Sequence, residues 1–382
     1  MRKGCEYKRL GDYIEEYSAK NKAGEDIPVY SVTNSRGFCK EYFSKEVASQ
    51  DKSAYKIVPY GFFAYNPSRI NVGSIDWQHK EKRVIVSPLY NVFCIKEGLE
   101  QPYLLYFLKS PATIKYIAVV AIGTVRLNLK LSMLKEFCIP VPPVNIQQSI
   151  VTELDKINEL INLKKSQLND LDALSQSIFY NMFGDPVVNE KGWEVKKLRE
   201  IGKITTGNTP SKAVPAYYDH PFIEWIKTDN IEQDSQFATV AKEFLSEEGA
   251  MRGRVVDEGS LLVACIAGSI ESIGKSCITN RRVAFNQQIN AIVPNELIDI
   301  LFLYHLVKSM KKVIQDYATT GMKHILTKSA MEMIEIPLPP LSLQQSFAAK
   351  IAKIETEKKQ VKVSLKDLET LLASRMQYWF DN

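Results

Sequence analysis

Apolar residues recur at heptad spacing in two long stretches of this chain, and the two stretches are copies of one another. The first runs from Ile139 to Phe183 and the second from Ile336 to Phe380. They align without a gap, and roughly sixteen of about forty-five positions are identical by direct count. Each copy opens with a proline-rich segment and a Gln-Gln pair, and a long helical pattern follows. The pattern predicts an internal repeat of two amphipathic helices.

Each predicted helix carries a narrow apolar seam whose positions alternate by four and three residues. The seam positions are Leu154, Ile157, Ile161, Leu168 and Leu171 in the first copy, and Ile351, Ile354, Val361, Leu365, Leu368 and Leu372 in the second. Lys164 and Lys358 interrupt the seams, as polar residues do where register or a partner is specified. Because a lone amphipathic helix leaves its seam in water, we expect the two copies to pack on each other. The alternative is two unrelated surface helices, but the ungapped match and equal lengths argue against it.

The stretches before the two repeats resemble each other in pattern. Short runs of β-branched and aromatic residues, broken by Gly, Asn and Pro, predict strands joined by turns. Each stretch also holds a predicted helix, at residues 102–121 and 297–318. The fold class is therefore α+β, in the order domain, helix, domain, helix. The expected boundaries are 1–138 for the first domain, 139–183 for the first repeat, 184–335 for a linker and the second domain, and 336–382 for the second repeat.

Length and composition are those of a folded two-domain protein, with 382 residues, 45% hydrophobic and 24% charged. The longest apolar runs are far too short to cross a bilayer, and the first residues have no apolar core typical of a signal peptide. The six cysteines are scattered without a C-x-x-C pair, which predicts reduced thiols in the cytoplasm. The four histidines are far apart, so we expect no metal site and no cofactor.

The net charge of +5 is unevenly distributed. Residues 1–138 hold 21 Lys and Arg against 14 Asp and Glu, and residues 184–335 hold 18 against 20. A polyanionic partner is therefore plausible for the first domain and is not demanded by the charge of the second.

Catalytic motifs are mostly absent. GSIESIGKS (268–276) has five residues between its first and second glycines, where a phosphate loop needs four, and we interpret it as a turn. Asp185 followed by Glu194-Val195-Lys196 has the residue types of a nuclease site but falls in a linker. No dinucleotide-binding, hydrolase or methyltransferase signature occurs. The sequence favours a recognition or scaffolding component over an enzyme.

The whole chain resembles the specificity subunit of a type I restriction–modification enzyme. The resemblance rests on the IPVPP…QQ and IPLPP…QQ helix starts, on FAYNPSRINVGSI, TTGNTPS, IGKSCI and FNQQINAI, and on GTVRLNL and GMKHILTKSAM just before the repeats. It implies two target-recognition domains, each reading half of a bipartite DNA site, held apart by an antiparallel coiled coil of the repeat helices. It also implies two methyltransferase subunits and two ATP-driven restriction subunits as partners, in an adenine-N6 methyltransferase and endonuclease.

Elementary geometry agrees with that resemblance. Two antiparallel repeat helices generate a pseudo-two-fold axis, and duplex DNA offers equivalent groove faces about 34 Å apart. A helix of about thirty residues spans roughly 45 Å, enough to seat domains in successive grooves. Because the two domains differ in sequence, their half-sites should differ too.

Candidate base-reading residues are polar side chains in turn segments, since Asn, Gln, Arg and Lys make bidentate contacts to bases. The candidates are Asn34, Arg36, Asn66, Arg69, Asn71 and Arg126 in the first domain, and Thr209, Lys212, Asn230, Lys275, Lys323 and His324 in the second. Each is alternatively a solvated turn residue. Two rival hypotheses are a coiled-coil adaptor that does not bind DNA and an enzyme fused to a recognition unit; retention of a specific duplex tests the first, and the missing motifs argue against the second.

Overall fold

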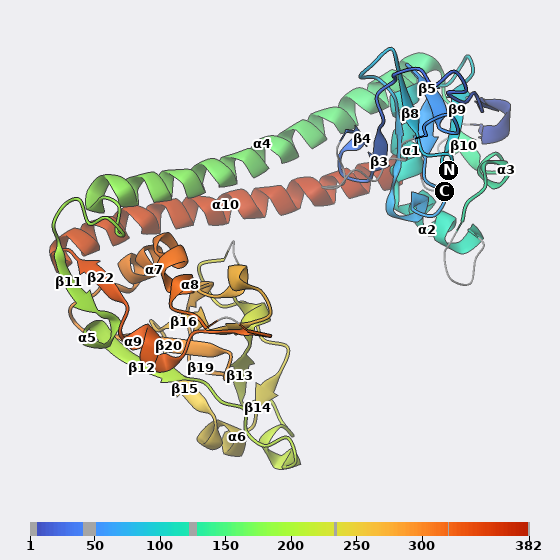
Figure 1. The fold of residues 1–382 in the computed structure, drawn as a ribbon. Helices are drawn as coiled ribbons and strands as arrows, with labels where there is room; N and C mark the ends of the chain where they lie inside the picture. Colours follow the sequence, from blue (N-terminus) through green and yellow to red (C-terminus); the bar gives the residue numbers. More distant parts are fainter. Residues whose placement is uncertain (1–5, 41–50, 122–127, 233–234, 320, 381–382) are drawn as a thin grey trace. The chain divides into compact units, whose positions relative to one another are not determined.

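The computed structural model describes residues 6–40, 51–121, 128–232, 235–319 and 321–380. The chain divides into two compact units, and each unit contains parts of both repeat helices. Unit 1 comprises residues 1–166 and 362–382, and unit 2 comprises residues 167–361 (Figure 1). None of the helices in the described ranges is both long and apolar enough to span a bilayer.

Unit 1 is built on a four-stranded antiparallel sheet in the order β2-β9-β6-β7, with three short ladders and five short helices around it. Its strands are β1 (Tyr7–Arg9), β2 (Ile14–Glu16), β3 (Ser31–Thr33), β4 (Gly37–Cys39), β5 (Lys56–Pro59), β6 (Phe63–Tyr65), β7 (Ile75–Trp77), β8 (Arg83–Val86), β9 (Asn91–Ile95) and β10 (Cys138–Pro140). Its short helices are η1 (Leu10–Asp12), η2 (Ile70–Val72), α1 (Gln101–Lys109), α2 (Pro111–Val120) and α3 (Leu131–Leu134).

Unit 2 repeats this plan with the sheet β12-β20-β16-β18, and in its second sheet, β14-β13-β19-β15, β13 and β19 are parallel, as Val29 and Ile85 are in unit 1. Its strands are β11 (Glu194–Lys197), β12 (Gly202–Thr206), β13 (Ile223–Ile226), β14 (Phe244–Leu245), β15 (Arg254–Val256), β16 (Leu261–Ala264), β17 (Ile266–Ala267), β18 (Ser276–Ile278), β19 (Val283–Phe285), β20 (Ile289–Pro294), β21 (His324–Ile325) and β22 (Glu335–Leu338). Its short helices are α5 (Leu198–Ile201), η3 (Pro215–Tyr217), η4 (Thr228–Asn230), α6 (Glu247–Arg252), η5 (Ile270–Ser272), α7 (Ile300–Ser309), α8 (Lys311–Asp316) and α9 (Lys328–Glu332).

The two units therefore share one topology beyond the repeat helices. The ladder β1-β10 corresponds to β11-β22, the helices α1 and α2 correspond to α7 and α8, and α3 corresponds to α9. The internal repeat that the sequence indicates for the helices thus extends to the domains in front of them.

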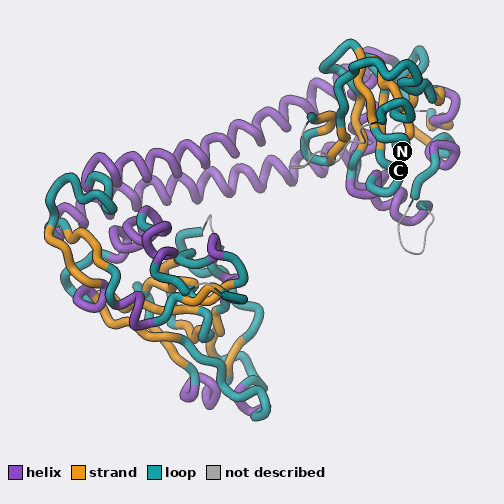
Figure 2. The backbone as a smooth tube through the Cα atoms, in the orientation of Figure 1, coloured by secondary structure: helices purple, strands orange, loops and turns teal. Residues whose placement is uncertain are grey.

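The repeat helices are α4 (Val144–Phe183) and α10 (Leu341–Phe380), and within each unit they lie side by side and antiparallel (Figures 1 and 2). In unit 1, Leu154 near the start of α4 shares a core with Leu372 and Phe380 near the end of α10. In unit 2, Phe183 at the end of α4 shares a core with Ile351 near the start of α10. The predicted antiparallel pairing is confirmed.

Aromatic residues at the helix ends fasten each helix to a domain. The ring of Phe380 lies 5.4 Å from that of Tyr103 in α1, and the ring of Phe183 lies 4.7 Å from that of Phe302 in α7. Each helix therefore starts beside one domain core and ends packed in the core of the other unit.

The start of each helix is held by a buried glutamine. The amide of Gln147 donates to the carbonyls of Gly98 and Pro142, both at 2.8 Å, and its oxygen accepts from the backbone N–H of Glu100 at 3.0 Å. Gln344 makes the same three kinds of bond, to Leu297, Pro339 and Asp299. Both side chains are fully buried, so these bonds fix where α1 and α7 meet the helix starts.

Residues 102–121 form α1 and α2, interrupted just before Pro111, whereas the helix predicted at 297–318 differs from the structure. Residues 297–318 form two helices, α7 and α8, with a break at Met310. The break lets Gln315 donate to the carbonyls of Ile270 and Ile273, which seats α8 on the loop around η5. No proline marks the break, so the local sequence contained no signal for it.

Candidate nucleic-acid interface

In unit 1 the β3–β4 hairpin presents a polar tip. Asn34 and Arg36 are exposed there, and the backbone N–H of Arg36 donates to the hydroxyl of Thr33 at 3.1 Å. Gly37 closes the turn with φ +58°, a conformation that favours glycine. The tip is therefore a tight turn with two candidate base-reading side chains in solvent.

A second polar segment, residues 66–73, lies against this tip. A Cβ atom on Gly73 would lie 2.6 Å from the side-chain oxygen of Asn34, so the two segments are in direct contact. The backbone N–H of Arg69 donates to the carbonyl of Asn66 at 2.9 Å, so these two candidates lie in one turn of the segment. Asn71 lies in the same segment, half-buried within η2. Five of the six candidates in the first domain thus gather on one surface, and Arg126 lies outside the described residues.

In unit 2 the segment after β12 packs against the segment before β20. The backbone N–H of Gly207 donates to Ile289, and a Cβ on Gly207 would lie 2.1 Å from the carbonyl oxygen of Asn286. The hydroxyl of Thr209, an exposed candidate, donates to the side chain of Gln287, which is also exposed. The segments TTGNTPS and FNQQINAI are therefore in direct contact with each other.

A buried asparagine joins the pre-repeat segment to this site. Asn290 accepts from Thr206 at 2.7 Å and donates to the carbonyl of Leu326 at 3.2 Å. In unit 1 the corresponding Asn91 donates to the phenol of Tyr65 at 2.9 Å, and that phenol donates to Leu129 at 3.0 Å. In both units an asparagine side chain is thus linked to a carbonyl of the segment before the repeat. The link is direct in unit 2 and passes through the phenol of Tyr65 in unit 1.

The other candidates of the second domain are dispersed. Lys212 and Lys323 are exposed, Lys275 is half-buried, and His324 lies on β21 opposite Ala267. The Nδ1 atom of His324 is buried and has no hydrogen-bond partner among the described residues.

Asn230 does not have the placement expected of a base-reading residue. Its side chain is 7% exposed, accepts from the backbone N–H of Lys227 at 3.0 Å and donates to the carbonyl of Val240 at 3.2 Å. These bonds cap η4, and they leave the amide no free edge for a base. The polar turn context that suggested the residue is the same context in which asparagine commonly caps a turn.

Sequence reasoning missed residues that act through distant contacts. Asp76 accepts from the backbone of Phe38, and Lys109 donates to the carbonyl of Asn34. The partners are 38 and 75 residues apart in the chain, so no local pattern connects them. Gly37 is the one signal in the sequence, because a glycine in a turn suggests that another part of the chain lies close to it. It does not show which part that is.

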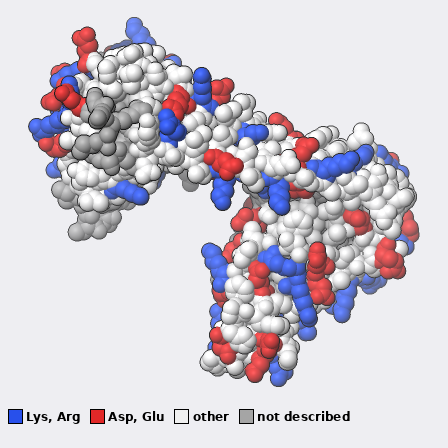
Figure 3. Space-filling view, turned by 180° about the vertical axis from the view of Figure 1, so that it is seen from behind, with Lys and Arg blue, Asp and Glu red and all other residues white. Residues whose placement is uncertain are grey.

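Charges of both signs are interspersed over the face shown in Figure 3. Lys and Arg side chains on this face are therefore separated by acidic and uncharged residues.

The two weak catalytic patterns do not form sites. The backbone N–H groups of Ser272, Ile273 and Gly274 all donate to carbonyls of their own loop or of Ala264, so none is available to a phosphate. The carboxylate of Asp185 accepts from the backbone of Val187. Across the described ranges, no group of three or more His, Cys, Asp or Glu side chains is arranged to hold a metal ion.

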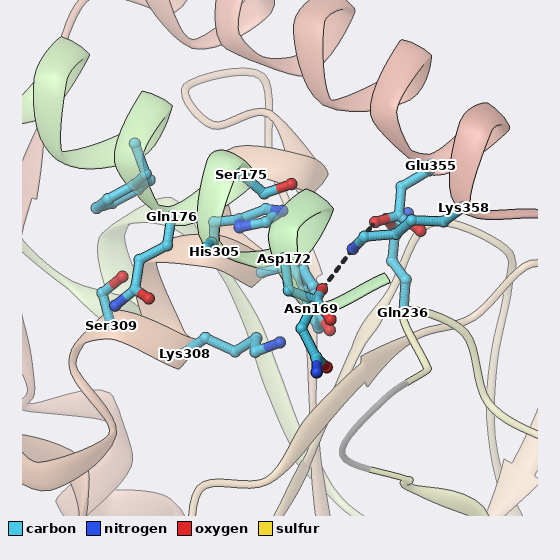
Figure 4. Close-up of a pocket in the computed structure, with 13 residues that line it drawn as sticks. Asn169, Asp172, Ser175, Gln176, Gln236, His305, Lys308, Ser309, Glu355 and Lys358 are labelled. Carbon is cyan, nitrogen blue, oxygen red and sulfur yellow. Dashed lines mark hydrogen bonds and ion pairs between the residues drawn. The ribbon is translucent and has the colours of Figure 1, made fainter. Parts of the chain in front are cut away.

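A polar cavity of about 400 Å³ lies in unit 2 where α7 faces α4 and α10 (Figure 4). It is lined by Asn169, Asp172, Ala173, Ser175, Gln176, Phe179, Gln236, Tyr304, His305, Lys308, Ser309, Glu355 and Lys358. The ammonium of Lys358 bridges Asp172 and Glu355, each at 2.6 Å. Burial lowers the pKa of Lys358, but these two hydrogen bonds outweigh it and the pKa is raised.

His305 faces this cavity as a neutral imidazole. Burial, with smaller effects from the charges of Lys308 and Lys358, lowers the pKa of His305 to about 3. Its Nε2 atom is buried and has no hydrogen-bond partner in the part of the chain that the structure describes.

Two units of one topology, each with polar turns in solvent and each containing parts of both repeat helices, define a protein built by internal duplication. Comparison with known families agrees. The family described as "Type I restriction modification DNA specificity domain" matches residues 5–173 and 190–366. The chain belongs to this family, whose members are generally non-catalytic subunits.

Individual relatives are consistent with this assignment. The MjaIX specificity subunit of Methanocaldococcus jannaschii is 26% identical over 302 residues, which are 72% of this chain and 68% of the relative. The HindI specificity subunit of Haemophilus influenzae is 33% identical over 171 residues, 43% of this chain and 36% of the relative. A solved structure described as the structural basis of complex assembly and conformational transition of the type I restriction–modification system matches with a TM-score of 0.63 at 15% identity, covering 100% of this chain and 98% of that chain.

Proposed function

We propose that this chain is the DNA-reading subunit of a type I restriction–modification complex, with each domain reading one half of a split site. The observation that carries the proposal is that two domains of one topology bear different polar surfaces at corresponding places. A repeated fold gives two equivalent ways to face a duplex, and different side chains give two different half-sites.

The proposed division of labour follows the chain. Residues 1–138 and 184–335 would read bases, and residues 139–183 and 336–382 would set the distance between the half-sites and bind the partner subunits. The contacting residues in the first domain would be Asn34, Arg36, Asn66, Arg69 and Asn71. In the second domain they would be Thr209, Lys212, Lys275, Lys323 and His324, and the chain itself would carry out no chemistry.

The partners we propose are two methyltransferase subunits and two ATP-driven restriction subunits, acting on double-stranded DNA in the cytoplasm. With them the complex would methylate the N6 atom of one adenine on each strand of the split site. Because the second domain holds 18 Lys and Arg against 20 Asp and Glu, partner subunits would supply much of the phosphate contact there.

The test is methylome sequencing of cells that carry this chain with its methyltransferase. The expected result is N6-methyladenine at one motif made of two defined halves and an undefined gap. A gel shift of the purified complex on that motif, against a duplex with scrambled halves, gives the matching binding measurement. An assembled complex that binds both duplexes equally would favour the coiled-coil adaptor, and turnover by the isolated chain would contradict a non-catalytic role.

A further inference from the structure

The carboxylate of Asp76 accepts a hydrogen bond from the backbone of the β3–β4 hairpin, next to its tip. One oxygen accepts from the backbone N–H of Phe38 at 3.0 Å, and the other accepts from the backbone N–H of Trp77 at 2.9 Å. A Cβ atom on Gly37 would lie 1.8 Å from the first oxygen, so the turn sits directly on the carboxylate. Asp76 is 6% exposed, which strengthens these charged hydrogen bonds.

A half-buried lysine holds the other side of the tip. The ammonium of Lys109, the last residue of α1, lies 3.4 Å from the carbonyl oxygen of Asn34. Burial lowers the pKa of Lys109, and the charge of Asp76 opposes that shift. The turn that carries Asn34 and Arg36 therefore lies between an anion and a cation that both belong to the domain framework.

This arrangement is confined to the first domain. Among the described residues of unit 2, β13 takes the place of β3, since Trp225 pairs in parallel with Ala284 as Val29 pairs with Ile85, and the segment after β13 forms η4 instead of a hairpin. Lys308 follows Asp299 by nine residues, as Lys109 follows Glu100, so it marks the corresponding place on α7. Lys308 lines the polar cavity instead of holding a turn.

We propose that Asp76 and Lys109 are positioning residues that set the base preference of the first domain by fixing the turn at Asn34 and Arg36. A side chain reads a base only if its backbone is held in place, since bidentate contacts need both hydrogen bonds aligned. The hydrogen bonds of Asp76 and Lys109 go to backbone atoms on both sides of the tip, which leaves its side chains exposed for contact. This inference rests on the proposed function.

The test uses the full chain in complex with its methyltransferase subunits and a library of duplexes in which one half-site is intact and the other is randomised. The variants are Asp76→Asn, which keeps the size of the side chain but only one acceptor oxygen, and Lys109→Met, which keeps its length without the charge. We expect the preference for the correct first half to fall at least about tenfold, the size of one good bidentate contact. The preference for the second half should remain that of the unaltered complex.

Two further variants separate positioning from general damage. Lys109→Arg keeps the charge and should restore most of the lost preference. Lys308→Met, the matched change in unit 2, should leave the first-half preference unchanged. The first half is identified as the one altered when residues 1–138 are replaced by those of another family member.

The outcomes distinguish this inference from the proposed function. Equal losses at both halves, or variants that no longer co-purify with the methyltransferase, would mean that Asp76 and Lys109 only support folding. Full retention of the first-half preference in both Asp76→Asn and Lys109→Met would overturn the inference while leaving bipartite reading intact. An unaltered complex without a bipartite preference would overturn the proposed function itself.

Discussion

His305 and Tyr106 occupy corresponding positions on α7 and α1 and make different contacts with the repeat helices. The phenol of Tyr106 donates to Asp155 at 2.6 Å and accepts from Asn158 at 2.9 Å, both on α4. The imidazole of His305 leaves the cavity of unit 2 beside it, with a buried nitrogen that has no partner among the described residues. The residue at this position thus hydrogen-bonds to α4 in unit 1 and borders a cavity in unit 2.

Replacing His305 by Tyr should reduce the sensitivity of the protein to acid. The folded imidazole has a pKa of about 3, whereas the unfolded one takes up a proton near its ordinary value of 6.5. Because the unfolded state binds more protons, stability falls as pH drops from about 6.5 towards 3. At pH 5 this residue costs up to about 2 kcal/mol, and His305→Tyr should remove that cost.

Urea unfolding at pH 7.5 and pH 5 measures the difference. His79→Gln changes an exposed histidine and serves as the control. An unchanged acid sensitivity in His305→Tyr would show that the imidazole is not held neutral in the folded protein.

At the scale of elements, one glutamine of each Gln-Gln pair holds the start of its repeat helix against the domain. Gln147 and Gln344 are fully buried and bind backbone groups of the domain, whereas their neighbours Gln148 and Gln345 are exposed. The buried glutamine ties the first turn of the long helix to the residues that precede the short helix of the same domain.

Gln147→Ala should destabilise unit 1 by about 2–5 kcal/mol, because it leaves buried carbonyl and N–H groups without partners. Gln148→Ala removes an exposed side chain of the same type and should change stability by less than about 0.5 kcal/mol. Thermal unfolding of both variants provides the comparison. Equal stability of the two would show that water replaces the lost bonds at no cost.

At the scale of the whole molecule, each repeat helix belongs to both units. Residues 144–166 of α4 lie in unit 1 and residues 167–183 in unit 2, and α10 runs the other way. The chain thus combines two exchangeable domains with one shared helix pair, so base identity and half-site spacing should be separable properties.

Exchanging residues 194–335 for the corresponding domain of another family member should change one half of the methylated motif. The other half and the gap should stay the same, because they depend on the first domain and on the helices. Methylome sequencing of the variant measures both halves at once. A change in both halves would contradict independent reading by the two domains.

Adding four residues to each repeat helix should widen the gap while both halves stay the same. The insertions would follow Lys165 and precede Glu369, an ion pair at 3.7 Å in unit 1. Four residues lengthen a helix by about 6 Å. At 3.4 Å per base pair, that is nearly two base pairs. The measurement is the motif methylated by the variant complex. Altered bases at an unaltered spacing would contradict the proposal that the helix pair sets the distance between the half-sites.

Most of the architecture could be predicted from the sequence because its signals are local. Heptad spacing fixes which face of α4 and α10 is apolar, and the seam positions Leu154, Ile161 and Ile351 are buried where the pattern predicts. The order of domains and helices follows from the repeat that occurs twice in one chain, and the family resemblance follows from that repeat together with motifs found in one domain each.

Tertiary structure decided the properties that depend on distant partners. Sequence alone could not show that Asn230 caps a turn, that Gln147 is buried and Gln148 exposed, or that Asp76 lies under Gly37. A polar side chain in a turn has the same local pattern whether it binds solvent, backbone or DNA. Only the folded chain brings together the groups, tens of residues apart, whose hydrogen bonds and burial determine which of these it does.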